Sequence, residues 1–154
     1  MLLFALLACQ ESRVPADADH FTVTVTATSD TCHPDASEGY EETFEYAVFF
    51  ADAQRAEVYV GEELFAVGTI AGCTLSYQTV VFGEETEADG NVKWQLFGEA
   101  QFDTVPGADA CVDGEDDWLG EEVFEIVSSV DETLEPGCQY VTETRGKAVA
   151  APVE

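Results

Sequence analysis

Basic residues are scarce in this chain. Its 154 residues include 5 Lys and Arg against 32 Asp and Glu, which gives a formal net charge of −27 with histidine neutral. So few cations cannot neutralise a nucleic-acid backbone, because each phosphate contact requires a cationic partner. The same shortage removes electrostatic attraction to anionic lipid headgroups. We therefore predict that nucleic acid is not a partner.

Histidine, the commonest catalytic base, is also scarce. The two histidines, His20 and His33, lie near the N-terminus, and the sequence has no hydrolase elbow, dinucleotide-binding or P-loop motif. Nucleophilic catalysis requires a base beside the nucleophile. Cys32 precedes His33, but adjacent residues of a strand point to opposite faces of the sheet. We therefore predict that the protein is not an enzyme.

Helical periodicity is lacking, and an alternation of apolar and polar residues takes its place. Residues 21–28 read F-T-V-T-V-T-A-T, the period of two that is typical of a half-buried strand. Hydrophobic residues make up 46% of the chain, enough for a core despite the charge. The pattern predicts an all-β fold, an antiparallel β-sandwich or small β-barrel of about seven to nine strands, with disulfides. The expected strands lie at 21–28, 44–50, 57–60, 64–70, 73–81, 92–102, 122–130 and 138–144.

The clearest alternation runs over residues 92–102. Lys93, Gln95, Glu99 and Gln101 lie on its polar face. The opposite face carries Val92, Trp94, Leu96, Gly98, Ala100 and Phe102. Because Gly98 and Ala100 are small, this inner face has room for a large neighbour or a bend.

The chain begins with an uncharged apolar run that is too short to span a bilayer. Residues 1–8 read M-L-L-F-A-L-L-A and are followed by Cys9 and polar residues. The segment Leu6-Leu7-Ala8-Cys9 resembles the lipobox of bacterial lipoprotein signal peptides. The resemblance implies cleavage before Cys9, acylation of its thiol, as with palmitate, and attachment of the new N-terminus to a membrane. The alternative is a buried first strand over residues 1–9 with a core cysteine.

The resemblance also implies a compartment. Gln10 follows the cysteine, where Asp acts as an inner-membrane retention signal in Gram-negative bacteria, so an outer-membrane location is expected, periplasmic or surface-exposed. The usual positively charged region is missing, and we expect Met1 to lie inside a longer signal peptide. The segment Gly68 to Cys73 is similar in style to uncharacterised envelope lipoproteins of these bacteria.

The composition along the chain suggests four parts. Residues 1–8 are the expected signal peptide, and residues 9–19, with Pro15, are an expected lipidated flexible tether. A single β domain is expected over residues 20–145. Residues 146–154 read as a flexible C-terminal tail.

Four cysteines remain once Cys9 is set aside for lipid. An even number in an oxidising envelope suits two disulfides, and Cys32, Cys73, Cys111 and Cys138 allow three pairings. We favour Cys32 with Cys73 and Cys111 with Cys138, because the second pair brackets a long acidic connection whose closure gains most from a crosslink. Zinc is the competing use, but the sequence has no C-x-x-C spacing.

Acidic residues crowd the segment 109–122, and no basic residue lies among them. Hard oxygen ligands of this kind suit calcium, the one ion that we keep as a candidate cofactor. The segment does not match an EF-hand, because Cys111 takes the third position and Gly120 the twelfth. A solvated acidic loop is the alternative. The candidate ligands are Asp109, Asp113, Glu115, Asp116 and Asp117.

Trp118 lies next to these carboxylates and is the aromatic residue expected to be most exposed. An exposed tryptophan can stack on a sugar ring or a cationic ligand, which makes Trp118 a candidate ligand-binding residue. We favour the other interpretation, in which Trp118 plugs one open end of the fold.

Two functions of different classes fit these observations. The favoured one is a non-enzymatic envelope lipoprotein, an acidic β-domain held at the membrane by N-terminal lipid, with a binding or structural role toward a protein or glycan. A calcium-stabilised adhesion or sugar-binding module is a variant of it. The other is a small-ligand carrier or hydrolase on a closed barrel, with Trp94, Phe102 and Tyr77 around a cavity. A filled interior favours the first function, and an open apolar cavity favours the second.

Overall fold

The computed structural model of the chain describes residues 14–32, 40–79, 83–87, 90–102, 115–129 and 135–150. This part contains nine strands, which confirms the all-β prediction. Each expected segment coincides with a strand, and β6 is the strand that the alternation did not indicate. The strands are β1 (Asp19–Asp30), β2 (Glu41–Phe50), β3 (Arg55–Val60), β4 (Glu63–Ala71), β5 (Thr74–Thr79), β6 (Gly83–Glu87), β7 (Gly90–Phe102), β8 (Trp118–Ser129) and β9 (Gln139–Val149).

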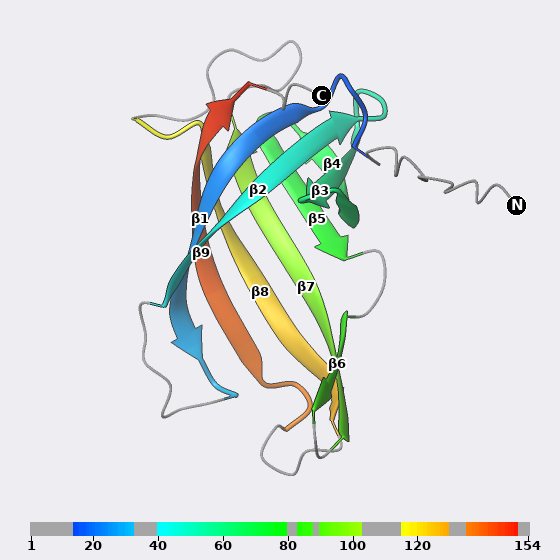
Figure 1. Cartoon of the computed structure of the whole chain (residues 1–154), viewed down its shortest axis with the longest axis vertical. Helices are drawn as coiled ribbons and strands as arrows, with labels where there is room; N and C mark the ends of the chain where they lie inside the picture. Colours follow the sequence, from blue (N-terminus) through cyan, green and yellow to red (C-terminus); the bar gives the residue numbers. More distant parts are fainter. Residues whose placement is uncertain are drawn as a thin grey trace, which may run out of the picture.

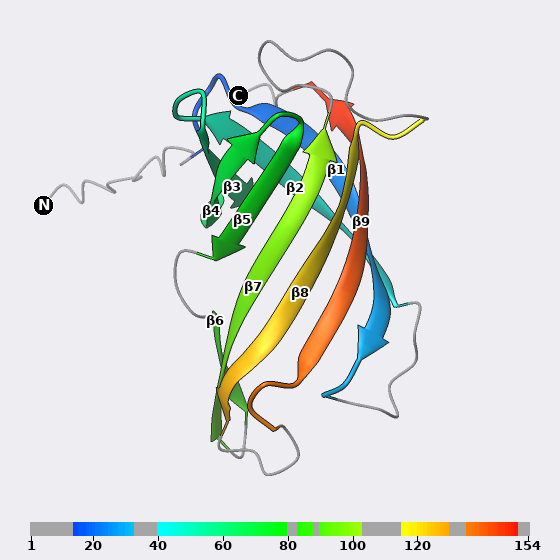
Figure 2. The same cartoon turned by 180° about the vertical axis from the view of Figure 1, so that it is seen from behind.

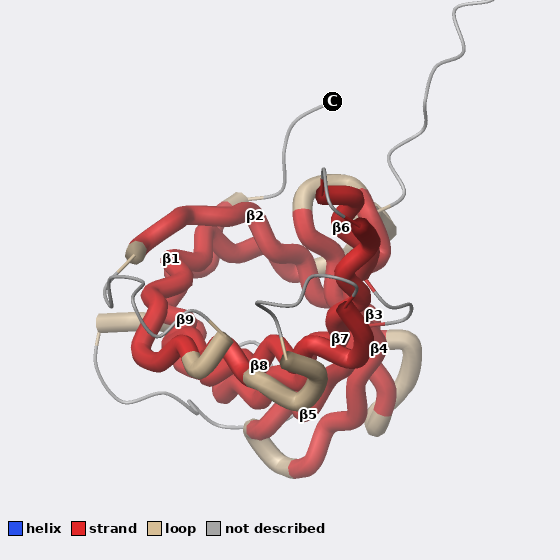
Figure 3. The backbone as a smooth tube through the Cα atoms, turned by 90° about the horizontal axis from the view of Figure 1, so that it is seen from below, coloured by secondary structure: helices blue, strands red, loops and turns tan. Residues whose placement is uncertain are grey.

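The strands form an antiparallel sheet that closes into a barrel (Figure 1, Figure 3). The order along the sheet is β5-β4-β3-β2-β1-β9-β8-β7-β6, and an additional pairing of β5 with β7 joins eight strands into a ring. Strand β6 pairs with the first part of β7, so that β6 continues the line of β5 along the same edge. Of the two predicted architectures, the barrel is confirmed and the sandwich is wrong.

Alternation along each strand separates an apolar lumen from a polar outer wall. On β1, Phe21, Val23 and Ala27 are buried, whereas Thr22 and Thr28 are exposed. On β7, the buried side chains are those of Leu96, Ala100 and Phe102, as the alternation predicts. The period of two therefore determines which side chains enter the barrel.

The core lies toward one end of the barrel. Strands β7 and β8 have 13 and 12 residues, whereas β3 and β5 have 6 each, and β5 pairs with the last part of β7 (Figure 2). The largest fully buried side chains, Trp118, Phe21 and Phe102, lie at this end, where β1 and β8 begin and β7 ends.

Trp118 is the centre of this core, and the candidate role of a partly exposed, ligand-binding tryptophan is wrong. Its ring is 5.4 Å from that of Phe21, 5.6 Å from Phe102, 5.8 Å from Tyr46 and 6.2 Å from Tyr77. Trp118 points inward because it opens β8 in phase with the other inward residues of that strand. A fully buried ring cannot stack on a sugar at the surface.

Both ends of the domain are more ordered than expected. Val14 and Ala18 pack on the outer wall against Ala47 and Tyr59, and Ala18 N–H donates to the Pro15 carbonyl at 3.0 Å. The expected flexible tether of residues 9–19 is therefore docked from Val14 onward. Residues 1–13, including Cys9, lie outside the described residues.

The expectation of a flexible tail over residues 146–154 is wrong for residues 146–149, and residues 151–154 lie outside the described residues. Strand β9 continues to Val149, which pairs with His20 of β1. A Cβ atom at Gly146 would lie 3.0 Å from Val23 Cγ2, so this glycine lets β9 pass close to β1. Pairing with β1 extends the strand beyond the residues that its own sequence pattern indicates.

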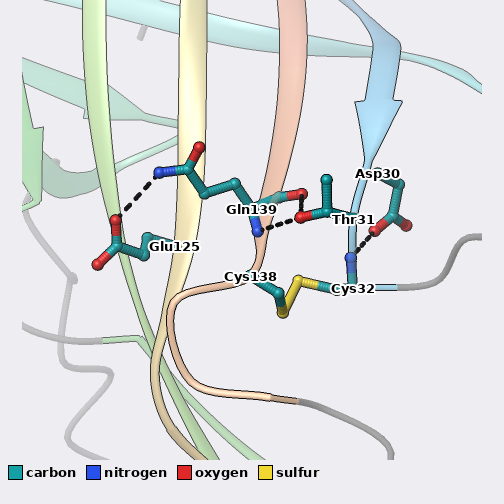
Figure 4. The surroundings of a disulfide bond; sticks show 6 residues. All are labelled: Asp30, Thr31, Cys32, Glu125, Cys138 and Gln139. Atoms are coloured by element: carbon teal, nitrogen blue, oxygen red, sulfur yellow. Dashed lines mark hydrogen bonds between the residues drawn. A yellow bond between two sulfur atoms is a disulfide. The ribbon is translucent and has the colours of Figure 1, made fainter.

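A disulfide joins Cys32, just after β1, to Cys138, just before β9, across 106 residues of sequence (Figure 4). The favoured pairing of Cys32 with Cys73 and of Cys111 with Cys138 is therefore wrong. The two cysteines meet because β1 and β9 are neighbours in the closed barrel. Thr31 N–H donates to the Gln139 carbonyl at 2.8 Å in the same place. Cys73 is also disulfide-bonded, and Cys111 lies outside the described residues.

Candidate functional site

A carboxylate is buried inside the barrel. Glu122 is only 1% exposed because the alternation on β8 places it on the same face as Trp118 and Phe124. In the sequence, Glu122 is the last of the acidic residues that crowd segment 109–122. Glu122 is separated from each of the two aromatic residues by an even number of positions. This spacing in a strand was the signal that would have placed Glu122 inside the barrel.

Two tyrosines hold the Glu122 carboxylate. Tyr77 Oη, from β5, donates to Glu122 Oε1 at 2.6 Å, and Tyr46 Oη, from β2, donates to the same oxygen at 3.0 Å. Hydrogen bonds to a charged acceptor are stronger than those between neutral groups. These bonds therefore connect β2, β5 and β8 through the lumen.

A glycine makes the bond between Tyr77 and Glu122 geometrically possible. Tyr77 pairs with Gly98 across the sheet, and Gly98 pairs with Glu122. A Cβ atom at Gly98 would lie 2.2 Å from Tyr77 Cζ, so the tyrosine ring lies across the position where a side chain would be. The prediction that Gly98 leaves room for a large neighbour is confirmed.

The buried cluster shifts the ionisation of its members. Burial raises the pKa of Glu122, and the hydrogen bonds from Tyr77 and Tyr46 oppose this increase. Burial and the Glu122 carboxylate raise the pKa of both tyrosines well above its ordinary value. The folded state therefore disfavours ionisation of all three groups.

A groove of about 1280 Å³ lies on the outer wall across β3, β4, β5, β7 and β8. Its lining includes Gly68, Gly98 and Gly120, so the groove and the buried cluster are the two sides of one stretch of wall. Cβ atoms at these three glycines would lie within 3.0 Å of neighbouring atoms. Because these three inward positions are glycines, the strands and the inner side chains can pack closely beneath the groove.

One row of outward residues in the groove is apolar except for Gln78. Val67 pairs with Gln78, Gln78 with Phe97, and Phe97 with Val123, so these outward residues follow one line across four strands. Val67 and Phe97 are each 42% exposed. We refer to Val67, Phe97 and Val123 as the apolar row.

A second row is acidic. Glu99 of β7 pairs with Glu121 of β8, two residues along β7 from Phe97. The Ser76 hydroxyl is 3.4 Å from Glu99 Oε2, and the described residues include no ion pair to Glu99 or Glu121. We refer to Glu99 and Glu121 as the acidic row.

Other charged groups in and around the groove have partners. Arg55 Nε, at one end of the groove, lies 2.6 Å from Asp52 Oδ2. Glu57 lies beyond Val67 in register and accepts a hydrogen bond of 2.7 Å from the Tyr59 hydroxyl. Burial and this carboxylate raise the pKa of Tyr59 to about 12.

The candidate calcium ligands are only partly within the described residues. Asp116 Oδ2 lies 3.4 Å from Arg145 Nη1, and Asp117 Oδ2 accepts a hydrogen bond of 2.8 Å from Ala148 N–H. These two carboxylates therefore contact β9. Glu115 is exposed, and Asp109 and Asp113 lie outside the described residues. No group of three or more His, Cys, Asp or Glu suited to a metal occurs in the described part of the chain.

The residues expected around a cavity contact other aromatic residues. Phe102 and Tyr77 are buried and pack against Trp118. Trp94 is half-buried, and its ring lies 5.5 Å from that of Phe124. Trp94 Nε1 and Thr142 Oγ1 are buried and have no hydrogen-bond partner among the described residues. Aromatic packing occupies this part of the lumen.

Comparison with known proteins identifies no relative. No protein-family model, no curated protein and no solved structure matches the chain. Over the described ranges, no helix has the length and apolar character needed to cross a membrane.

Proposed function

We propose that this protein is a non-enzymatic binding domain of the cell envelope. Lipid on Cys9 holds it at the outer membrane, and the outer wall of the acidic barrel contacts a partner. The observation that carries the proposal is a contrast between the two sides of the wall: aromatic side chains pack against one another inside, and a groove of about 1280 Å³ lies outside.

The buried carboxylate also favours binding over catalysis. A catalytic acid must reach its substrate, whereas Glu122 is covered and one of its oxygens accepts hydrogen bonds from two tyrosines. A structural role in connecting three strands accounts for its position. The outer wall is then the surface available for a partner.

Membrane fractionation tests the anchor. We expect Cys9→Ser to release the protein into the soluble fraction, because the acylated thiol is the proposed attachment. Gln10→Asp is the matched control and should stay membrane-bound while moving to the inner membrane. Retention of the Cys9→Ser protein in the membrane would overturn the anchoring.

Native mass spectrometry tests the choice between binding domain and carrier. Protein purified from membranes in mild detergent should have the mass of the acylated chain with no retained apolar compound. A small molecule retained at one per barrel would support a carrier and contradict the proposal.

A further inference from the structure

The acidic row places like charges directly opposite each other. Glu99 and Glu121 are cross-strand partners, and Glu121 in turn pairs with Glu143 of β9. Opposed like charges destabilise a sheet. Arg145 Nη2 lies 4.0 Å from Glu143, but Arg55, the one basic residue in the groove lining, is paired with Asp52. The groove therefore presents unneutralised carboxylates to whatever binds there.

The apolar row lies beside these carboxylates. Phe97 and Glu99 are two residues apart on β7 and point to the same face, which separates the two rows by about 7 Å. A small inorganic cation would contact only the acidic row. An occupant that uses both rows must carry positive charge and apolar groups side by side.

We propose that the groove binds an extended segment of a partner protein in which Lys or Arg alternates with apolar residues. An extended chain presents successive side chains on opposite edges, so one edge can cover the apolar row while the other meets the acidic row. The inference rests on the proposed binding function of the outer wall and specifies the partner's chemistry. The net charge of −27 attracts such a segment from a distance, and the two rows determine where it binds.

A titration with short peptides tests the inference. The probe is an acetylated and amidated peptide, Lys-Val-Lys-Leu-Lys-Val-Lys, added to the full chain in low-salt buffer and measured by calorimetry. One comparison peptide replaces each Lys by Glu, and another replaces each Val and Leu by Ser. We expect saturable binding of the first peptide only, at one site per barrel.

Two charge-matched triple variants locate the site. Glu57→Gln, Glu99→Gln and Glu121→Gln together replace the acidic row and the one further carboxylate of the groove lining, and should weaken binding of the lysine peptide about tenfold. Glu41→Gln, Glu45→Gln and Glu63→Gln make the same change in net charge at exposed positions away from the groove and should weaken it less than about twofold. The Phe97→Ser variant should also weaken it about tenfold, because the apolar contact is lost. Melting temperatures confirm that each variant is folded.

The outcomes separate this inference from the function on which it rests. Equal weakening by both triple variants would assign binding to the overall charge and overturn the inference, as would the absence of saturable binding up to roughly 1 mM peptide. If Phe97→Ser weakened the glutamate peptide as much as the lysine peptide, the groove would bind peptides without regard to charge. The proposed binding function would then stand, and the cationic partner would be wrong.

Discussion

Two threonines on β9 have opposite hydrogen-bonding situations inside the barrel. Thr142 Oγ1 is buried without a partner, whereas Thr144 Oγ1 accepts a hydrogen bond of 3.0 Å from Trp118 Nε1. Thr142→Val should stabilise the protein by about 1 kcal/mol, because an unpaired buried hydroxyl is removed. Thr144→Val is the matched control and should destabilise it by about 1–2 kcal/mol, because the indole N–H loses its acceptor. Urea unfolding measures both changes in the free energy of unfolding. Equal losses of stability in the two variants would contradict this interpretation of the two lumen-facing hydroxyls.

Glu122 makes stability depend on pH in a particular direction. Burial raises its pKa in the folded state, so the unfolded chain loses its proton first as pH rises. The contribution of Glu122 to the free energy of folding is therefore least unfavourable below the pKa of the unfolded chain, about 4. It becomes more unfavourable as pH rises from there through the pKa of the folded state. Glu122→Gln keeps an oxygen acceptor for Tyr46 and Tyr77 and lacks this titration. Its stability relative to the natural protein should increase from pH 4 to pH 7.

Urea unfolding at several pH values measures this effect. Glu121→Gln removes a carboxylate at the adjacent exposed position and serves as the control. A Glu122→Gln difference that stays constant with pH would contradict the assignment. Glu122→Ala should be destabilising at every pH by about 2–4 kcal/mol, since it leaves a cavity and deprives both tyrosine hydroxyls of their acceptor.

At the residue scale, the sequence predicted which way a side chain points from its strand better than how exposed it is to solvent. Alternation placed Tyr77, Gly98 and Phe102 on inward faces, and the structure confirms all three. The candidate exposure of Trp118 was wrong, because it relied on the acidic neighbours in the sequence, and alternation was not used to place Glu122 inside. Strand parity overrides local polarity once the segment pairs on both sides.

At the scale of the elements, the pairing of β1 with β9 closes the barrel between distant parts of the chain. The Cys32–Cys138 disulfide fixes this junction across 106 residues. Replacing both cysteines by Ser should destabilise the protein by about 2–5 kcal/mol, because the unfolded chain regains the freedom that a long closed loop removes. Urea unfolding measures the loss, and hydrogen exchange should increase first near Thr31 and Gln139. An unchanged unfolding midpoint would show that strand pairing alone fixes the junction.

Strand pairing also explains what the sequence could not predict at this scale. Local patterns indicate strands but not which distant strands are neighbours, so the disulfide partner of Cys32 and the extension of β9 to Val149 were both missed. The groove is a similar case. Its rows combine residues of β4, β7 and β8, and only the register of the barrel aligns Val67 with Phe97.

For the whole molecule, a net charge of −27 implies repulsion that salt reduces. Raising NaCl from about 10 mM to 500 mM shortens the screening length from about 30 Å to a few ångströms, and the melting temperature should rise. Scanning calorimetry measures this change. A melting temperature that stays constant would mean that self-repulsion has little effect on folding.

Calcium at matched ionic strength tests the acidic segment separately. If Asp109, Asp113 and their neighbours bind the ion, millimolar calcium should raise the melting temperature beyond the effect of NaCl. Equal midpoints in calcium and in chelator would eliminate a structural ion. The contacts of Asp116 and Asp117 with β9 leave fewer carboxylate oxygens for calcium than the sequence suggested.

The docking of Val14 to Ala18 on the wall has a consequence for the proposed lipid anchor. Because residues 14–18 pack on the barrel, only the chain from Cys9 to Val14 can serve as the linker between lipid and barrel. This linker spans at most about 18 Å when fully extended. That distance is about twice the screening length at physiological salt, so the acidic body would be held close to the bilayer and repelled by its anionic headgroups. With Cys9 acylated, the side of the barrel that carries Ala47 and Tyr59 would face the membrane. The barrel would then have a preferred orientation relative to the bilayer.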